Sequence, residues 1–179
     1  MTQAVFFDRD GVLNEDHGYL YRIEDFKFLP GVASLKQLVD AGFLLFLVTN
    51  QSGVGRGYYT MADVDKLHAH MAGELARQGI GFRRIYAAPE VPGQPSRGRK
   101  PSPQFLFDAR DEFGVNLAES YMVGDKLIDL ETGWNAGVKK SILVRTGYGS
   151  EVEREAADKL KPAVVVDNVA AAVEWILGQ

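Results

Sequence analysis

Short apolar runs alternate with amphipathic segments along the chain, and this alternation limits the fold more than any other feature. Runs with the length of buried strands occupy residues 4–7, 43–48, 85–87, 120–123, 141–144 and 163–166. Strands that alternate with helices form a parallel sheet with helices on both faces. We therefore expect an α/β fold with a doubly wound, Rossmann-like parallel sheet, folded as one domain over residues 1–179.

Capping residues mark the helices between these runs. Thr60 and Asp63 form a variant of the capping box at the start of one helix. Ser102 followed by Pro103 indicates the N-cap and first residue of the next. The last helix is expected over residues 169–177.

Composition narrows the class of protein. The 179 residues are 46% hydrophobic and 25% charged, with a net charge of −4, so the chain can bury a substantial core. The chain has no basic tract that would favour binding to nucleic acid. The longest apolar run that follows Gly42, residues 43–48, is too short to span a bilayer. The first strand leaves no room for a signal peptide, and the chain has no cysteine for disulfides. We expect a cytoplasmic monomer with no nucleic-acid or membrane partner.

Polar residues follow directly after several expected strands. Asp8 and Asp10 come after the first strand, Thr49 after the second and Asp125 after the fourth. Lys100 lies in the loop that leaves the third. Ligands of a doubly wound sheet bind beyond the carboxyl ends of its strands. These five side chains are therefore expected at one edge of the sheet.

Three carboxylates at one edge would repel one another without a cation. Asp8, Asp10 and Asp125 offer hard oxygen ligands, which suit Mg²⁺ that also binds a substrate phosphate. A carboxylate can also attack phosphorus and form an acyl phosphate. We interpret Asp8 as this nucleophile and Asp10 as the acid and base of the two steps. Thr49 and Lys100 would neutralise charge on the transferring phosphoryl group.

Four segments resemble, in order, the motifs of haloacid dehalogenase superfamily phosphatases. They are residues 8–12 (DRDGV), Thr49, Lys100 and residues 124–129 (GDKLID). Three further patches, at 14–19, at 49–53 with 56–57, and at 99–101, resemble the branch that contains heptose bisphosphate phosphatases and histidinol phosphatases. The resemblance covers nearly the whole chain, from Val5 past Gly147.

The resemblance implies a capless member, because no insertion of the size of a cap separates the motifs. It implies the same catalytic residues, Asp8, Asp10, Thr49 and Lys100. It also implies Mg²⁺ held by Asp8, Asp125 and the backbone carbonyl of Asp10. The residues that it places around the substrate are Asp16, His17, Gly18, Tyr19, Asn50, Gln51, Ser52, Arg99 and Lys126.

The implied activity is removal of the C7 phosphate of a heptose 1,7-bisphosphate through an aspartyl phosphate, a step of nucleotide-heptose and lipopolysaccharide core synthesis. Histidinol-phosphate phosphatase is the alternative within this branch. A receiver-type signalling domain is a distant alternative, since it also places an Asp cluster, a Thr and a Lys around Mg²⁺. Its phosphorylated Asp follows the third strand, however, and residues 86–89 (YAAP) offer none.

The loop ahead of Arg99 departs from the pattern of this branch, whose members often hold a structural zinc there with Cys and His. The corresponding positions here are Ala88, Glu90, Ser96 and Gly98. Because these residues cannot build a zinc site, we expect no zinc. The loop should instead be held by its prolines and by packing.

Two further features concern single side chains. Asp129 has two interpretations that the sequence leaves open: a place near the metal, or a favourable charge at the N-terminus of its helix. His68 and His70 lie two residues apart in an expected helix, so they do not share a face. We expect both histidines to be solvated.

Overall fold

A six-stranded parallel sheet forms the centre of the computed structural model, which describes residues 2–179. Its strands are β1 (Ala4–Phe7), β2 (Leu44–Asn50), β3 (Phe82–Ala88), β4 (Tyr121–Gly124), β5 (Lys140–Val144) and β6 (Val164–Val166). They lie in the order β3-β2-β1-β4-β5-β6, and every neighbouring pair is parallel. The predicted strands and the doubly wound fold are confirmed.

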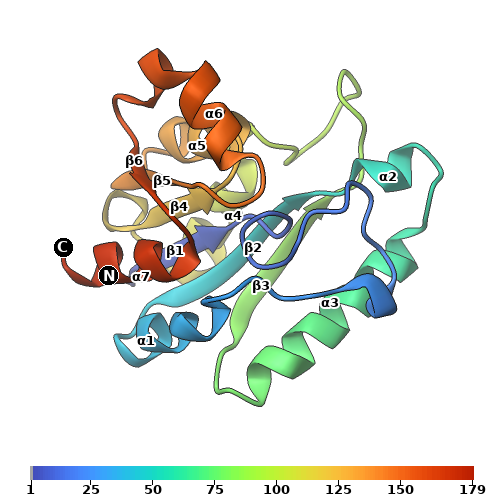
Figure 1. Ribbon diagram of the computed structural model, residues 1–179, viewed down its shortest axis with the longest axis horizontal. Helices are drawn as coiled ribbons and strands as arrows, with labels where there is room; N and C mark the ends of the chain where they lie inside the picture. Colours follow the sequence, from blue (N-terminus) through green and yellow to red (C-terminus); the bar gives the residue numbers. More distant parts are fainter. Residues whose placement is uncertain (1) are drawn as a thin grey trace.

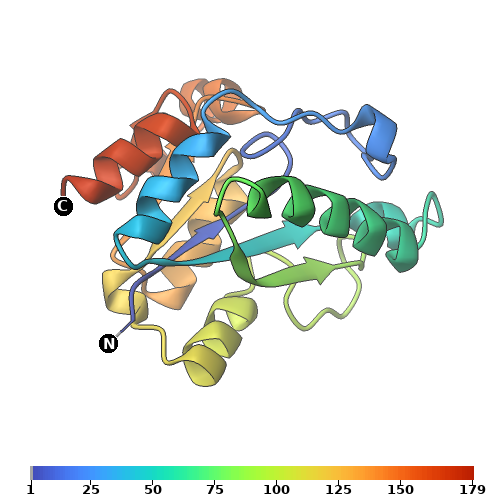
Figure 2. The same cartoon turned by 90° about the horizontal axis from the view of Figure 1, so that it is seen from below.

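Helices connect successive strands and cover both faces of the sheet (Figure 1). They are α1 (Leu35–Asp40), α2 (Ser52–Gly55), α3 (Met61–Ala76), α4 (Gln104–Phe113), α5 (Leu127–Ala136), α6 (Gly149–Glu155) and α7 (Val169–Leu177). Short 3-10 helices span Ile23–Asp25, Val32–Ser34, Leu117–Glu119 and Ala157–Leu160. Figure 2 shows α1, α3 and α7 on one face, with α4 on the other. Among residues 2–179, no helix has the length and hydropathy needed to cross a membrane.

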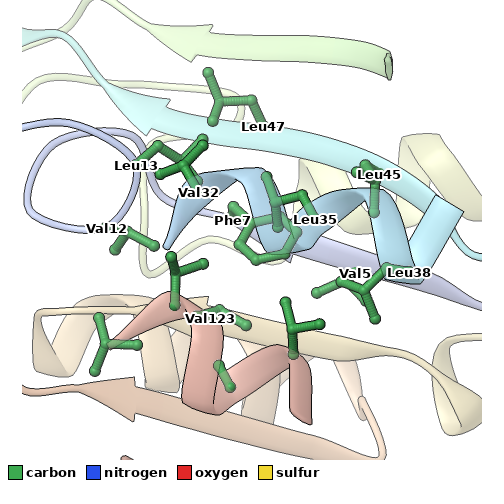
Figure 3. Packing of buried hydrophobic residues seen from close by; sticks show 14 of the residues in the cluster. Val5, Phe7, Val12, Leu13, Val32, Leu35, Leu38, Leu45, Leu47 and Val123 are labelled. Atoms are coloured by element: carbon green, nitrogen blue, oxygen red, sulfur yellow. The ribbon is translucent and has the colours of Figure 1, made fainter. Parts of the chain in front are cut away.

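The strands bury alternate side chains on opposite faces. Val5 and Phe7 belong to the hydrophobic cluster under α1, α3 and α7, whereas Phe6 belongs to the cluster under α4. Figure 3 shows Leu35 and Leu38 of α1 against the first of these sets. Both sides of β1 are therefore apolar, because successive residues of a strand point in opposite directions.

The capping residues place two helices close to where the sequence predicts them. Thr60 Oγ1 accepts from Asp63 N at 3.2 Å and Thr60 N donates to Asp63 Oδ2 at 2.9 Å, which confirms the capping box of α3. Helix α4 begins at Gln104, one residue later than predicted. Ser102 is already held by a turn, since its backbone N donates to Arg99 O. Helices α1 and α2 were not predicted, because six and four residues give too little periodicity.

Candidate active site

The carboxyl ends of the central strands carry the predicted polar residues. Strand β1 lies between β2 and β4, where the strand order reverses. Phe7 pairs with Leu47 on one side and with Val123 on the other, and Asp8 N donates to Val123 O at 3.0 Å. Asp8 and Asp125 thus leave adjacent strands at nearly the same level. This is the position at which doubly wound folds bind ligands.

Asp8, Asp125 and Asp129 form a buried cluster of carboxylates. One oxygen from each lies within 4.8 Å of the other two, and none of the three residues is more than 5% exposed. Burial, reinforced by the charges of Asp129 and Asp8, raises the pKa of Asp125 to about 8. Asp125 Oδ1 is buried without a hydrogen-bond partner. An unpartnered oxygen among like charges fits a hard divalent cation such as Mg²⁺.

Asp129 contacts both the start of its helix and Lys100. Its Oδ2 accepts from Lys126 N at 2.9 Å at the start of α5, and its Oδ1 lies 2.6 Å from Lys100 Nζ. Burial raises the pKa of Asp129, although the Lys100 ammonium opposes that shift. Asp129 therefore caps its helix and belongs to the carboxylate cluster as well.

Lys100 lies between two of these carboxylates. It is 3% exposed, and its Nζ is 2.8 Å from Asp8 Oδ1 as well as close to Asp129. Burial acts to lower the pKa of Lys100, but the Asp129 and Asp8 carboxylates outweigh it and leave that pKa raised. The side chain is held as an ammonium beside Asp8.

Asp10 lies apart from the cluster and has its own donors. Its Oδ1 accepts from Arg9 Nε at 3.1 Å and from Asn14 Nδ2 at 2.9 Å. Its Oδ2 accepts from Arg9 Nη2 at 3.0 Å and from Gln51 Nε2 at 3.2 Å. The two acids after β1 therefore have different surroundings: Asp8 faces a lysine and other carboxylates, whereas Asp10 faces an arginine and two amides.

Gly11 allows the backbone to turn directly above the carboxylates. Its φ is +80°, and a Cβ placed there would lie 2.3 Å from Asp125 Oδ2. Gly11 N donates to Asn14 O at 2.8 Å and closes the turn. Glycine is required both by the left-handed backbone and by the close approach of Asp125.

A pocket of about 350 Å³ opens over these groups. Its lining consists of Asp8, Asp10, Asp16, Gly18, Tyr19, Thr49, Asn50, Ser52, Arg99, Lys100, Lys126, Ile128 and Tyr148. The structure thus gathers eleven of the predicted residues around one cavity, to which Ile128 and Tyr148 are additions. Tyr148 follows β5 without a recognisable motif, so its position after a strand was its only signal.

Two residues predicted around the substrate lie outside this lining. The side chain of His17 is 53% exposed, with its Nε2 3.4 Å from Glu15. Gln51 is buried behind Thr49: its Nε2 donates to Thr49 Oγ1 at 2.8 Å, and its Oε1 accepts from Tyr59 Oη at 3.0 Å. Both ends of the Gln51 amide are used by the protein itself.

One wall of the pocket combines charge with an aromatic ring. Lys126 Nζ lies 3.1 Å from Asp16 Oδ2 and 4.6 Å from the centre of the Tyr148 ring. Burial acts to lower the pKa of Lys126, but nearby carboxylates, Asp125 first, outweigh it and leave that pKa raised. On the loop after β1, Tyr19 packs edge-on against Tyr58 at 4.8 Å. This wall can therefore contact both an anion and the carbon face of a sugar.

The loop ahead of Arg99 is joined by hydrogen bonds. Ser96 Oγ donates to Glu90 Oε2 at 2.7 Å and accepts from Arg99 N at 3.0 Å. Arg99 Nη1 donates to Glu90 O at 2.7 Å. The expectation that prolines and packing hold this loop is therefore incomplete, because Glu90 and Ser96 also contact each other directly through a hydrogen bond.

His68 lies inside the protein, so the expectation that it is solvated was wrong. It is 5% exposed, and its Nε2 lies 3.1 Å from Arg9 Nη1. Burial, with help from the charge of Arg9, lowers the pKa of His68 to about 3. The signal was present, since position 68 lies four residues after Val64 on the inner face of α3.

Four groups reach the same edge of the sheet in the order typical of haloacid dehalogenase-like hydrolases. They are the Asp8 carboxylate, the Thr49 hydroxyl, the Lys100 ammonium and the Asp125 carboxylate. A family model described as HAD-hydrolase-like matches residues 98–172. The same fold class appears in a solved heptose 1,7-bisphosphate phosphatase from B. bronchiseptica, complexed with magnesium and phosphate. That structure superposes with a TM-score of 0.88 at 31% identity and covers 99% of each chain.

Curated relatives narrow the family. The D-glycero-beta-D-manno-heptose-1,7-bisphosphate 7-phosphatase of Haemophilus ducreyi is 43% identical over 175 residues, 93% of this chain and 96% of the relative. The alpha-anomer enzyme of Campylobacter jejuni is 43% identical over 144 residues, 80% of this chain and 83% of the relative. The chain belongs to the family of D-glycero-D-manno-heptose-1,7-bisphosphate 7-phosphatases, and the predicted phosphatase family is confirmed.

Proposed function

We propose that this protein removes the C7 phosphate of D-glycero-D-manno-heptose 1,7-bisphosphate in nucleotide-heptose and lipopolysaccharide core synthesis. The observation that carries the proposal is a single pocket lined by Asp8, Asp10 and Lys100 and also by a separate cation, Arg99. The first three residues suit one phosphate that reacts, and the guanidinium suits a second that does not. The names of the relatives support the same substrate.

The proposed reaction has two steps. Asp8 attacks phosphorus while the bond to the sugar oxygen breaks, and Asp10 gives its proton to the departing alkoxide. Water then gives a proton to Asp10 and attacks phosphorus, which breaks the bond to Asp8 and releases phosphate. Lys100 and Thr49 offset charge on the phosphoryl oxygens in both steps.

The carboxylate cluster supports the use of Mg²⁺. Asp8, Asp125 and the backbone carbonyl of Asp10 would hold the ion, with Asp129 adjacent. When bound, it supplies positive charge to the phosphoryl oxygens. The residues offer oxygen ligands alone, which matches the preference of Mg²⁺ rather than that of a thiolate-binding metal.

Recognition of the sugar and its second phosphate is proposed for the rest of the lining. Arg99 has a planar fork that binds phosphate through two parallel hydrogen bonds. The remaining contacts are proposed for Asp16, Gly18, Tyr19, Asn50, Ser52 and Lys126. From their positions, we propose that Gln51 supports Thr49 and Asp10, and that His17 contacts the substrate from the solvent side.

Phosphate release from a substrate panel tests this function. The panel contains both anomers of the heptose bisphosphate, histidinol phosphate and simple sugar monophosphates, with Asp8→Asn as the inactive control. We expect the highest kcat/KM for a heptose bisphosphate, with loss of the C7 phosphate seen by NMR. A preference for histidinol phosphate would support the alternative phosphatase. A stable phosphoprotein with no turnover would support a signalling domain.

We also propose that the protein is a cytoplasmic monomer folded as one domain over residues 1–179, of which the first lies outside the described range. A net charge of −4, without a basic tract, gives no basis for a nucleic-acid partner. A monomer mass by light scattering and one cooperative unfolding transition would support this proposal. A dimer mass or two separate transitions would contradict it.

A further inference from the structure

Arg9 lies between the two acids in the sequence and is a fully buried charged group beside the pocket. Its exposure is 0%, although its neighbours in the chain, Asp8 and Asp10, both line the pocket. A buried guanidinium is tolerated only when it is paired and hydrogen-bonded. Its contacts therefore show what holds it and what it holds.

The guanidinium of Arg9 uses all three of its nitrogens. Nε and Nη2 donate to Asp10, and Nη2 also reaches Leu20 O at 3.0 Å and Gln51 Oε1 at 3.4 Å. Nη1 faces His68 Nε2 at 3.1 Å. Helix α3 thus contacts the guanidinium through His68, and the loop after β1 contacts it through Asp10 and Leu20. A fork held at both ends leaves the Asp10 carboxylate little freedom to turn.

The contact with His68 fixes the form of the imidazole. Every nitrogen of an arginine is a donor, so His68 Nε2 must accept and its proton must be on Nδ1. His68 is buried on the inner face of α3 between Leu67 and Met71. The imidazole therefore stays neutral and acts as a fixed hydrogen-bond acceptor for Arg9. His68 itself does not line the pocket.

We propose that Arg9 and His68 are positioning residues that hold the Asp10 carboxylate in line with the oxygen of the leaving group. Neither is a catalytic residue, because His68 contacts Arg9 and Arg9 contacts Asp10. This inference rests on the proposed role of Asp10 as general acid. It explains why an arginine, and not an apolar residue, fills the buried position between the two acids.

Leaving-group dependence separates positioning from a merely structural role. The kcat/KM value reports steps only up to formation of the aspartyl phosphate. An alkyl phosphate such as the heptose bisphosphate needs a proton on its departing oxygen, whereas the phenolate of p-nitrophenyl phosphate leaves without one. Misplacing Asp10 should therefore slow the first substrate and spare the second.

The variants are His68→Leu, which removes the acceptor, and His68→Gln, whose amide oxygen can replace it. Arg9→Lys keeps the charge and loses the fork. His70→Leu is the matched control, since His70 lies on the same helix and packs edge-on against Phe26. For His68→Leu and Arg9→Lys we expect kcat/KM for the heptose bisphosphate to fall by roughly 10- to 100-fold, the usual effect of a small misplacement.

The same two variants should keep kcat/KM for p-nitrophenyl phosphate within about twofold, and His68→Gln should recover most of the loss. Equal losses on both substrates, or no loss on either, would overturn the inference. Thermal melting identifies variants that are folded. Should Arg9→Lys not fold, the comparison of His68→Gln with His68→Leu decides alone.

Asp10→Asn distinguishes failure of this inference from failure of the proposed function. It should show the same dependence on the leaving group, with a larger loss. If Asp10→Asn shows that dependence and the His68 and Arg9 variants do not, the positioning role is rejected and the general acid stands. If Asp10→Asn shows no such dependence, the proposed function of Asp10 is rejected first.

Discussion

Three consecutive residues after β1 send their side chains to three different partners. Asp8 lies beside the Lys100 ammonium, Arg9 extends inward to His68, and Asp10 is held by Arg9 and Asn14. Two carboxylates of the same type thus have separate environments within three positions of the chain. Such a difference allows one acid to act as nucleophile and the other as acid and base.

Asp8→Asn should abolish turnover and leave the fold intact, because an amide cannot form the acyl phosphate. Asp10→Asn should retain Mg²⁺ binding yet lose roughly 10²- to 10⁴-fold in kcat, the usual contribution of a general acid and base. Phosphate release measures the loss of turnover in both variants, and circular dichroism shows whether Asp8→Asn keeps its fold. A near-normal kcat in Asp8→Asn would sink the covalent mechanism.

Arg99→Ala should reduce kcat/KM for a bisphosphate by roughly 10- to 100-fold, since a hydrogen bond to a charged group contributes about 1.5 to 3 kcal/mol. A small monophosphate ester, which has no second phosphate, should lose much less. Arg97→Ala is the control, because Arg97 pairs with Asp108 outside the pocket. Equal losses on both substrates would reject a role for Arg99 in binding the second phosphate.

Two elements support the site from outside its lining. The loop over residues 88–99 positions Arg99 through Ser96 and Glu90. Helix α3 supplies His68 behind Arg9. The contacts within the loop join residues three to nine positions apart, whereas His68 contacts Arg9 across 59 positions. The contribution of α3 therefore depends on a long-range tertiary contact, and that of the loop on contacts within one segment.

The purified protein should contain no stoichiometric zinc. Residues 88–98 include no Cys or His, and Glu90 is their only carboxylate, so four protein ligands for zinc cannot be assembled there. Elemental analysis measures the metal content. A zinc-selective chelator should change neither the Tm nor the activity supported by Mg²⁺. One zinc per chain, lost together with stability on chelation, would contradict this prediction.

Helix α3 should make the fold sensitive to acid through His68. The pKa of His68 is about 3 in the folded protein, and its ordinary value is 6.5. Below pH 6.5, His68 of the unfolded chain therefore binds a proton, whereas His68 of the folded chain stays neutral until the pH approaches 3. This contribution to stability is complete above pH 6.5 and is lost as the pH falls. The loss at pH 5 is about 2 kcal/mol at 1.36 kcal/mol per pH unit. Urea unfolding of the parent and of His68→Gln measures it, and parallel curves between pH 7 and 5 would contradict it.

Across the whole molecule, sequence patterns predicted the strands and the polar residues at their ends, and missed individual contacts between side chains. The strands and the residues directly after them, such as Asp8 and Thr49, follow from apolar runs and their ends. The pairing of Arg9 with His68 joins positions 59 residues apart, and Tyr148 reaches Lys126 from another loop. No local pattern records such contacts, because they exist only once the helices are packed on the sheet.

The carboxylate cluster that is proposed to bind Mg²⁺ should lower the stability of the fold when no metal is bound. Without a metal ion, the Lys100 ammonium offsets only part of the repulsion among the buried carboxylates of Asp8, Asp125 and Asp129, so the metal-free protein carries a destabilising feature. Asp125→Asn removes one of these charges. In EDTA at pH 8 we expect Asp125→Asn to melt at a higher temperature than the parent.

Saturating Mg²⁺ should reverse that order. At 100 times its Kd, a ligand of the folded state adds about 2.7 kcal/mol, which for a chain of this size corresponds to a rise in Tm of roughly 5 to 11 °C. The parent should show this rise, and Asp125→Asn should show little of it, because the unpartnered oxygen of Asp125 has been replaced by an amide. Differential scanning fluorimetry with EDTA and with Mg²⁺ measures both shifts. A parent protein that is already more stable than Asp125→Asn in EDTA would show that the cluster does not destabilise the metal-free fold.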